Sequence, residues 1–199
     1  MEDKSKHLGK AILTAVCFAL LVGGIYIVNN QDGQTPAPLM QSGNNGFSQK
    51  EIATAIKLAK RFKKAEYNIN YHNVPENSVT AIRHYKKTFK PYLTEKAFDN
   101  LSANRIFRIP GEAALNQKSN ISVQKITFDQ TEESKQDNSI NFNYRMKLAF
   151  QNEQGKITHN ISLKGQITLT RTKEGWKISR DWNERMPQEL VYPESGKNP

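Results

Sequence analysis

The chain has 199 residues, enough for one ordinary domain with additional segments. Hydrophobic residues make up 37% and charged residues 24%, which excludes a multi-span membrane protein and wholesale disorder. The one cysteine, Cys17, excludes an internal disulfide framework. Lys and Arg number 29 against 19 Asp and Glu, and this excess of positive charge favours acidic partners: nucleic acid, anionic lipid headgroups, envelope polymers or acidic protein surfaces.

An uncharged apolar run lies near the start of the chain. Residues 11–28 carry no charged side chain, and as a helix they would be about 27 Å long, close to the thickness of a bilayer's hydrocarbon core. Three lysines precede the run and no Lys or Arg follows until Lys50, so the positive-inside rule places residues 1–10 in the cytoplasm and the rest outside. A cleaved signal peptide would share these features. No pair of small residues of the A-x-A type follows, which favours an uncleaved transmembrane helix.

The segment after the apolar run differs sharply in composition. Residues 29–46 are rich in Gly, Pro, Asn and Gln, and they predict a flexible linker between the membrane and a folded domain. The part of the chain beyond the anchor contains no cysteine. That composition is typical of the outside of a Gram-positive bacterium, where disulfides are little used.

The first two helices predicted after the linker are amphipathic. A capping box of Ser48 and Glu51 begins the first, which should end near Glu66. The second should run from about residue 77 to Lys90, because the residue before a proline disfavours helix. The apolar faces contain Ile52, Ala55, Ile56, Ala59 and Phe62 in the first helix and Val79, Ile82, Tyr85 and Phe89 in the second. The opposite faces contain Lys57, Lys60, Arg61, Lys64, Arg83, Lys86, Lys87 and Lys90.

These basic faces have three interpretations, which the sequence leaves open. They could bind nucleic acid through its phosphates, or bind an anionic envelope polymer or lipid headgroups near the anchor. They could also be ordinary solvated faces. Aromatic residues do not interleave with the basic ones, so the pattern does not indicate stacking on single-stranded bases.

A third, short helix is predicted from Thr94 to Ala103, with Thr94 as its N-cap. Residues 106–119 follow it and include the turn signal Pro110-Gly111. We therefore expect this stretch to be irregular.

From Asn120 onward the apolar period changes to two, which predicts four antiparallel strands. The first covers Ile121 to Phe128, and its apolar parity shifts after Val123, which indicates a β-bulge. Residues 140–150 alternate strictly and form the second strand. Residues 157–170 form the third.

Gly165 interrupts the apolar row of the third predicted strand, which favours a bulge or sharp bend there. The fourth strand contains Trp176, Ile178 and Trp182. Residues 184–199 include three prolines and predict a loose tail, in which MPQELVY could form a short docked turn.

The outward positions of the second and third strands predict a polar sheet face. This face could be an interface or a solvated surface, and the pattern alone does not decide between them. Its members are Asn141, Asn143, Arg145, Lys147, Asn160, Ser162, Lys164, Gln166 and Thr168.

The sequence contains no recognisable catalytic or metal-binding motif. The four histidines lack metal-ligand spacing, and no G-x-S-x-G, Cys–His pair or phosphate-binding glycine loop is present. We therefore expect no catalytic residue, cofactor or metal. If the domain has a pocket, its polar groups would be the inward-facing Tyr85, Tyr144 and His159, with Asp99 as a further candidate. Core aromatics with their polar tips at the domain's edge are the favoured interpretation.

The predicted fold class is α+β. A single N-terminal transmembrane helix and a tether precede three helices packed on one face of a curved four-stranded antiparallel sheet, a half-cone over residues 47–183. The element order, the long strands and the closing G-W-K-I-S run at 175–179, followed by Asp181-Trp182, resemble the nuclear-transport-factor-two-like superfamily.

Within that superfamily, a short cytoplasmic tail, one membrane helix and one such outer domain resemble the bitopic scaffold proteins of bacterial type IV secretion and Gram-positive conjugation systems. The resemblance implies a non-enzymatic subunit that forms homo-oligomers, contacts other proteins of a membrane complex and often uses its sheet face to dimerise or dock. It transfers no individual functional residue. Two alternatives remain: an envelope ligand-binding or enzymatic cone domain, and a sporulation or cell-wall assembly factor.

Overall fold

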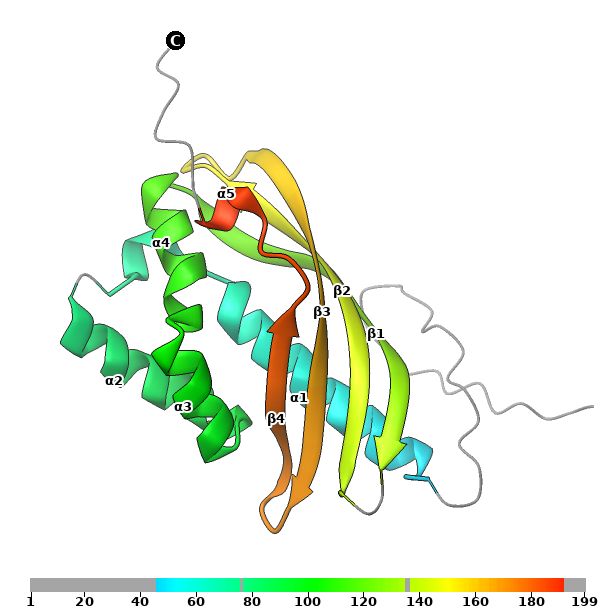
Figure 1. Cartoon of the computed structure of the whole chain (residues 1–199). Coiled ribbons are helices and arrows are strands. Elements are labelled where there is room, and N and C mark those ends of the chain that lie inside the picture. The colour runs from blue at the N-terminus through cyan, green and yellow to red at the C-terminus, as the bar shows by residue number, and fades with distance from the viewer. Residues whose placement is uncertain (1–45, 76, 135–136, 192–199) are drawn as a thin grey trace, which may run out of the picture. The chain divides into compact units, whose positions relative to one another are not determined.

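The computed structural model describes residues 46–75, 77–134 and 137–191, which belong to one compact unit. They form an α+β body in which helices precede a four-stranded antiparallel sheet, as predicted (Figure 1). The predicted cytoplasmic tail and anchor, the linker up to residue 45 and the tail beyond residue 191 lie outside the described residues. No helix within the described part is long and apolar enough to cross a membrane.

The sheet is a meander in which each strand pairs antiparallel with the next. Its strands are β1 (Asn120–Ser134), β2 (Ser139–Gln151), β3 (Ile157–Thr172) and β4 (Gly175–Asn183). The predicted bulge in β1 is confirmed as a register shift between Val123 and Lys125. Buried and more exposed residues alternate along β2 from Ile140 to Leu148, so one face of the sheet is covered and the other is open.

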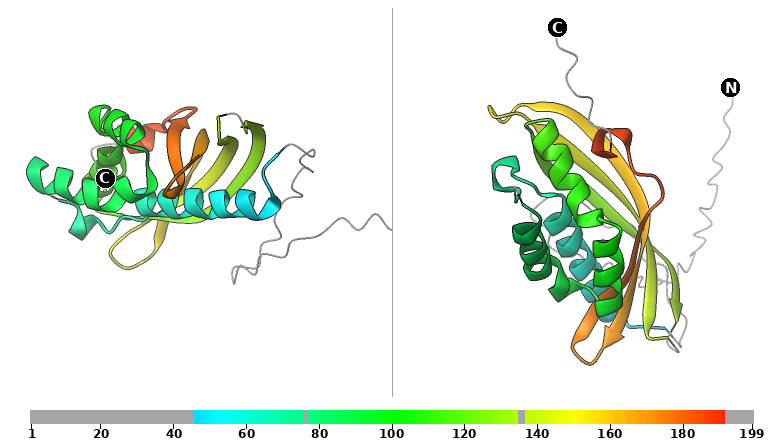
Figure 2. Two further views of the ribbon diagram at one scale, coloured as in Figure 1. Left: turned by 90° about the horizontal axis from the view of Figure 1, so that it is seen from below. Right: turned by 60° about the vertical axis from the view of Figure 1, so that its left-hand side comes forward.

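Helix α1 (Gln49–Tyr67) covers the inner face of the sheet, where it contacts β1, β3 and β4 (Figures 1 and 2). Its predicted capping box is confirmed: the Glu51 backbone N–H donates to Ser48 Oγ, and the Ser48 backbone N–H donates to Glu51 Oε2 at 2.9 Å. Most of the predicted apolar stripe, including Ile52 and Phe62, is fully buried. Local capping and helical periodicity therefore account for both the position and the buried face of α1.

Helix α2 (Ser78–Phe89) has the predicted bounds, with the Asn77 side chain as its cap. Its predicted buried face is only half right. Phe89 is buried and stacks on Phe107 with ring centroids 4.4 Å apart, whereas Val79 and Ile82 are 67% and 66% exposed. The prediction is wrong for the N-terminal half because the period identifies an apolar stripe but not how far along the helix the covering elements extend.

The remaining helices are α3 (Glu95–Ala103), α4 (Ile109–Asn116) and α5 (Gln188–Val191). Thr94 caps α3 as predicted. The prediction that residues 106–119 are irregular is wrong, because a short 3₁₀ turn leads directly into α4. Pro110 lies in the first turn of α4, where its missing N–H would have had no partner in the helix. Leu190 of α5 is buried, and α5 contacts α4, so residues 188–191 form the short docked turn that the sequence left open within the predicted loose tail.

Gly165 lies in regular pairing opposite Tyr144 of β2 and Asn183 of β4, so of the two predicted possibilities, a bulge or a sharp bend, the bulge is absent. A Cβ atom here would be 2.2 Å from the Trp182 carbonyl oxygen and 2.6 Å from Tyr144 Oη. The glycine is needed because the Tyr144 ring lies against it, and any side chain would displace that ring or the β4 backbone.

Candidate functional site

The structure brings together the nine polar residues predicted to share one face of the sheet. We call their surface, with the outward neighbours on β1 and β4, the outer sheet face. Every one of the nine is exposed or partly exposed, and Thr168 Oγ1 donates a hydrogen bond to Asn141 Oδ1 at 2.6 Å. The cross-strand pairs are Asn141–Thr168, Asn143–Gln166, Arg145–Lys164 and Lys147–Ser162, with Asn160 opposite Ala149.

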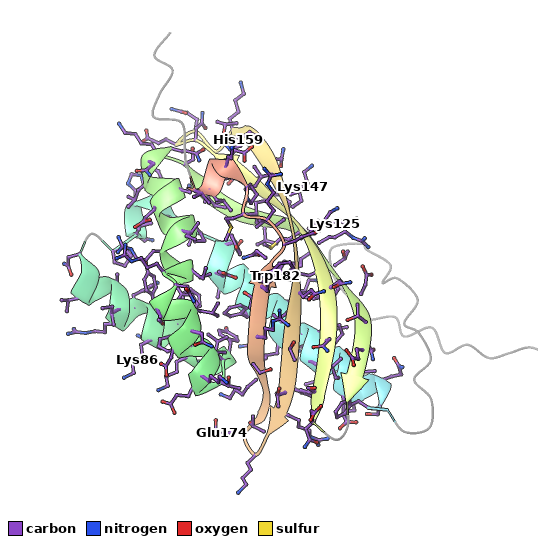
Figure 3. All side chains as sticks on the ribbon, viewed as in Figure 1. Lys86, Lys125, Lys147, His159, Glu174 and Trp182 are labelled. Carbon is purple, nitrogen blue, oxygen red and sulfur yellow. The ribbon has the colours of Figure 1, made fainter. Side chains whose placement is uncertain are left out.

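Four cations of the outer sheet face lie in two directly opposed pairs. Lys125 of β1 lies directly opposite Lys147 of β2, and Arg145 of β2 lies directly opposite Lys164 of β3 (Figure 3). Like charges in directly opposed positions destabilise a sheet. Asp129 Oδ2, 2.6 Å from Arg145 Nη2, offsets part of this repulsion. A negatively charged partner over these cations would relieve the rest of the repulsion.

Trp182 is exposed on the outer sheet face. It lies in register with Gln166, and 45% of its surface is accessible (Figure 3). The sequence places Trp182 in the same parity as the buried Trp176. A register shift at Ser179 reverses the alternation, so Asp181 faces inward and Trp182 outward. Exposed tryptophan among polar side chains is enriched at protein interfaces.

On the inner side of the sheet, Lys63 is fully buried between two carboxylates. Its Nζ lies 2.9 Å from Glu66 Oε2 and 2.7 Å from Asp181 Oδ2, and it lies 4.6 Å from the centroid of the Tyr144 ring and 5.5 Å from that of Tyr67. We call Lys63, Glu66 and Asp181 the buried ion cluster. It joins α1 to β4 beneath the centre of the sheet.

Burial controls the protonation of this cluster. Burial raises the pKa of Glu66 to about 7, the charge of Lys63 opposes the rise, and Asp181 adds to it. Burial alone would lower the pKa of Lys63, but the two carboxylates outweigh it and raise that pKa well above its ordinary value. Burial also raises the pKa of Tyr67 and Tyr144. The buried ion cluster therefore contains the cation of Lys63, and its Glu66 carboxyl can bind or release a proton near neutral pH.

Sequence reasoning missed this cluster, although part of it was visible. Lys63 follows Ala59 by four residues and Glu66 follows Phe62 by four, so both lie on the apolar stripe of α1. Charged residues on an apolar stripe indicate a buried ion pair. The position of Asp181 depends on the bulge at Ser179 and had no comparable signal.

The structure does not bring Tyr85, Tyr144 and His159 into one pocket. Tyr144 is buried beside the ion cluster. His159 stacks on Phe150 with ring centroids 4.2 Å apart, and Phe150 follows Tyr144 by six residues along β2, a separation of about 20 Å. Tyr85 packs among the aromatics of the helices, and Asp99 is exposed. Within the described residues, no cluster of three metal-ligating side chains could hold a metal ion.

The predicted basic helix faces are exposed or partly exposed throughout. On α1, Arg61 lies 5.9 Å from the centroid of the Tyr92 ring. Beside α2, Lys90 forms an ion pair with Glu95 at 3.1 Å. That these faces bind an anion remains a prediction. Their members are Lys57, Lys60, Arg61 and Lys64 on α1 and Arg83, Lys86, Lys87 and Lys90 on or just after α2.

No protein-family model and no curated protein matches the chain. Several solved structures are similar to it at low identity. An IcmL-like type IV secretion system protein from Legionella pneumophila is 13% identical over 71% of this chain and 97% of its own, with a TM-score of 0.48. The periplasmic domain of DotI is 13% identical over 72% of this chain and 100% of its own length, with a TM-score of 0.47. An Ntf2-like protein involved in plasmid conjugation is 12% identical over 68% of this chain and 50% of its own length, with a TM-score of 0.40. The sequence led us to expect a resemblance to proteins of these kinds.

Proposed function

We propose that this chain is a non-enzymatic, membrane-anchored assembly subunit of a conjugative transfer or type IV secretion apparatus. Residues 11–28 anchor it as a single-pass transmembrane helix, with the N-terminus in the cytoplasm of a Gram-positive bacterium. The α+β body lies outside the membrane as a half-cone, held by the linker, and contacts other subunits and further copies of itself through the outer sheet face.

One observation carries this proposal: the exposed Trp182 on the edge strand of a sheet face that also presents two pairs of directly opposed cations. A solvated sheet face needs neither an exposed indole nor directly opposed cations. Both features become favourable when another protein covers the face, because the indole is then buried and the cations gain acidic neighbours. The positive charge of these opposed pairs therefore supports acidic partners.

The interior of the body supports a scaffold role over the ligand-binding or enzymatic alternative. That alternative expects Tyr85, Tyr144 and His159 to converge on an open pocket. Tyr144 is instead only 1% exposed, and its hydroxyl donates to Asn183 Oδ1. A sporulation or cell-wall assembly factor would use the same surfaces with different partners, so the identity of the partners separates it from a transfer subunit.

Site-specific photo-cross-linking in intact cells tests the proposal. We expect a photoreactive residue at Gln166, on the outer sheet face, to form cross-links to a second copy of the chain or to another subunit of the transfer apparatus, identified by mass spectrometry. The same residue at Asn116, which is exposed at the end of α4, serves as the control and should give no such product. If neither position gives a cross-linked product, the proposal is contradicted. Cross-links to sporulation or cell-wall proteins would instead support the alternative that the chain is a sporulation or cell-wall assembly factor.

A further inference from the structure

Two large apolar side chains of α2 face solvent. Val79 and Ile82 are 67% and 66% exposed, more than any other large hydrophobic residue in the described part of the chain. They are three residues apart on a helix, so they lie on the same side of it and form one patch. Contiguous apolar surface of this kind marks a contact site when it adjoins a hollow.

Such a hollow lies beside Ile82, where α2 faces α3. A cavity of about 180 Å³ has walls that include Phe98 and Phe107, and cationic groups at its edge include Lys86 and Arg105. An apolar cavity of about 150 Å³ is large enough to bind benzene. This cavity therefore has room for one aromatic or large aliphatic side chain from outside.

A second hollow adjoins the first and is basic. It has a volume of about 780 Å³, shares Lys86 with the apolar cavity, and lies between α2 and the β3–β4 hairpin, on the side where Figure 3 labels Lys86 and Glu174. Its two carboxylates are already engaged, in the ion pairs Lys90–Glu95 at 3.1 Å and Lys177–Glu174 at 3.4 Å. The charges of Lys86, Lys87 and Lys173 remain to attract an anion.

We propose that these two hollows together form a docking surface for an acidic protein segment that carries an aromatic or large aliphatic side chain. That side chain fills the apolar cavity beside Ile82. The acidic groups of the same segment lie along Lys86, Lys87 and Lys173. We call the combined surface the α2 docking surface.

The apolar half of this surface favours a protein over a nucleic acid or an anionic polymer. Phe98 and Phe107 offer rings, but the cavity lining is almost entirely apolar, so a base inserted there would leave its polar edge without hydrogen-bond partners. An anionic polymer without apolar groups could satisfy the lysines but could not fill the cavity. A protein segment supplies both kinds of group from neighbouring positions.

This inference rests on the proposed function and deepens it by giving the chemistry of one partner. It concerns α2 and the β3–β4 hairpin, whereas the cross-linking test of the proposed function concerns the outer sheet face. The α2 docking surface can therefore fail its test while the proposed function stands, and the reverse holds as well.

Fluorescence anisotropy with defined probes tests the docking surface on the full-length chain in detergent micelles. The probes are a short fluorescein-labelled peptide of Glu and Ser with one central Phe, the same peptide with Ala in place of Phe, and a single-stranded DNA of equal charge. We expect the Phe peptide to bind about tenfold more tightly than the Ala peptide, because only Phe fills the cavity. Equal binding of the two peptides, tighter binding of the DNA, or no binding of the Phe peptide would overturn the inference.

Substitutions assign the binding to this surface. Ile82→Gln should weaken the Phe peptide about tenfold and leave the Ala peptide unchanged, and Lys86→Glu with Lys87→Glu should weaken both peptides. All three side chains are exposed, so the fold should tolerate these changes. Lys147→Glu, on the outer sheet face, is the matched control and should change neither. An effect of Lys147→Glu as large as that of the α2 changes would also overturn the inference.

Discussion

Replacing Lys63 by Met should lower the free energy of unfolding by about 3–5 kcal/mol, the usual cost of breaking a buried ion pair by removing one partner. The Asp181 carboxylate, 2.7 Å from Lys63 Nζ, would remain buried without a cation. Denaturant unfolding of the full-length chain measures this loss. Trp176 and Trp182, the two tryptophans of the chain, both lie in β4, the strand that carries Asp181, and report the unfolding of the domain by fluorescence.

Two further variants make the Lys63 result specific. Lys64→Met removes a neighbouring lysine that is exposed, and its effect should stay within about 0.5 kcal/mol. A variant with Lys63→Met, Glu66→Leu and Asp181→Leu replaces the whole cluster by apolar groups and should recover most of the stability. A loss below about 1 kcal/mol for Lys63→Met would contradict the structural role assigned to the cluster.

The stability of the folded chain should fall as pH rises from about 4.5 to about 7. The pKa of Glu66 is raised by folding from 4.5 to about 7, so the folded state binds more protons than the unfolded state in this window. The stability that protonated Glu66 contributes is fully present below the unfolded pKa and is lost as pH rises through the folded one. The loss amounts to about 3 kcal/mol.

Unfolding free energies of the wild type and of Glu66→Gln, measured across this pH range, test the linkage. Gln keeps the shape of a protonated Glu66 but cannot ionise, so the difference between the two proteins should grow with pH and level off above 7. Contributions from all other groups cancel in that difference. Glu112→Gln, at an exposed carboxylate of α4, provides the control and should leave the slope unchanged. Parallel curves for the wild type and Glu66→Gln would show that Glu66 does not carry the proton.

Local signals in the sequence were sufficient for most of the fold. The capping box at Ser48 and the parity shift after Val123 are confirmed, and the predicted alternation of residues 140–150 holds as far as Leu148 but fails at Ala149, which is buried. Irregularities that depend on distant contacts were not predictable. Position 165 requires a glycine because the Tyr144 ring on the neighbouring strand leaves no room for a Cβ atom.

Of the candidate surfaces, too, the sequence predicted the parts that depend on local patterns and missed the parts that depend on tertiary structure. The nine residues of the outer sheet face follow from strand alternation alone, and they do share one face. Trp182 was missed because the bulge at Ser179 reverses the alternation of β4. The exposed patch on α2 was missed because apolar periodicity was taken as burial, and only the tertiary structure shows that Val79 and Ile82 remain uncovered.

The proposed role requires two independent contact surfaces on one tethered body. The outer sheet face presents Trp182 and opposed cations, and the α2 docking surface presents an apolar cavity beside Lys86, Lys87 and Lys173. A subunit that connects other proteins needs more than one such surface, and contacts at both multiply its effective affinity for an assembled complex.

Transfer frequency in the cell that encodes this chain tests the central claim most directly. Deleting the chain should reduce conjugative transfer or secretion to background. The wild type should restore it, whereas Trp182→Ala, produced at the same level in the membrane, should not. Transfer that continues at the wild-type level without the chain would contradict a role in the apparatus.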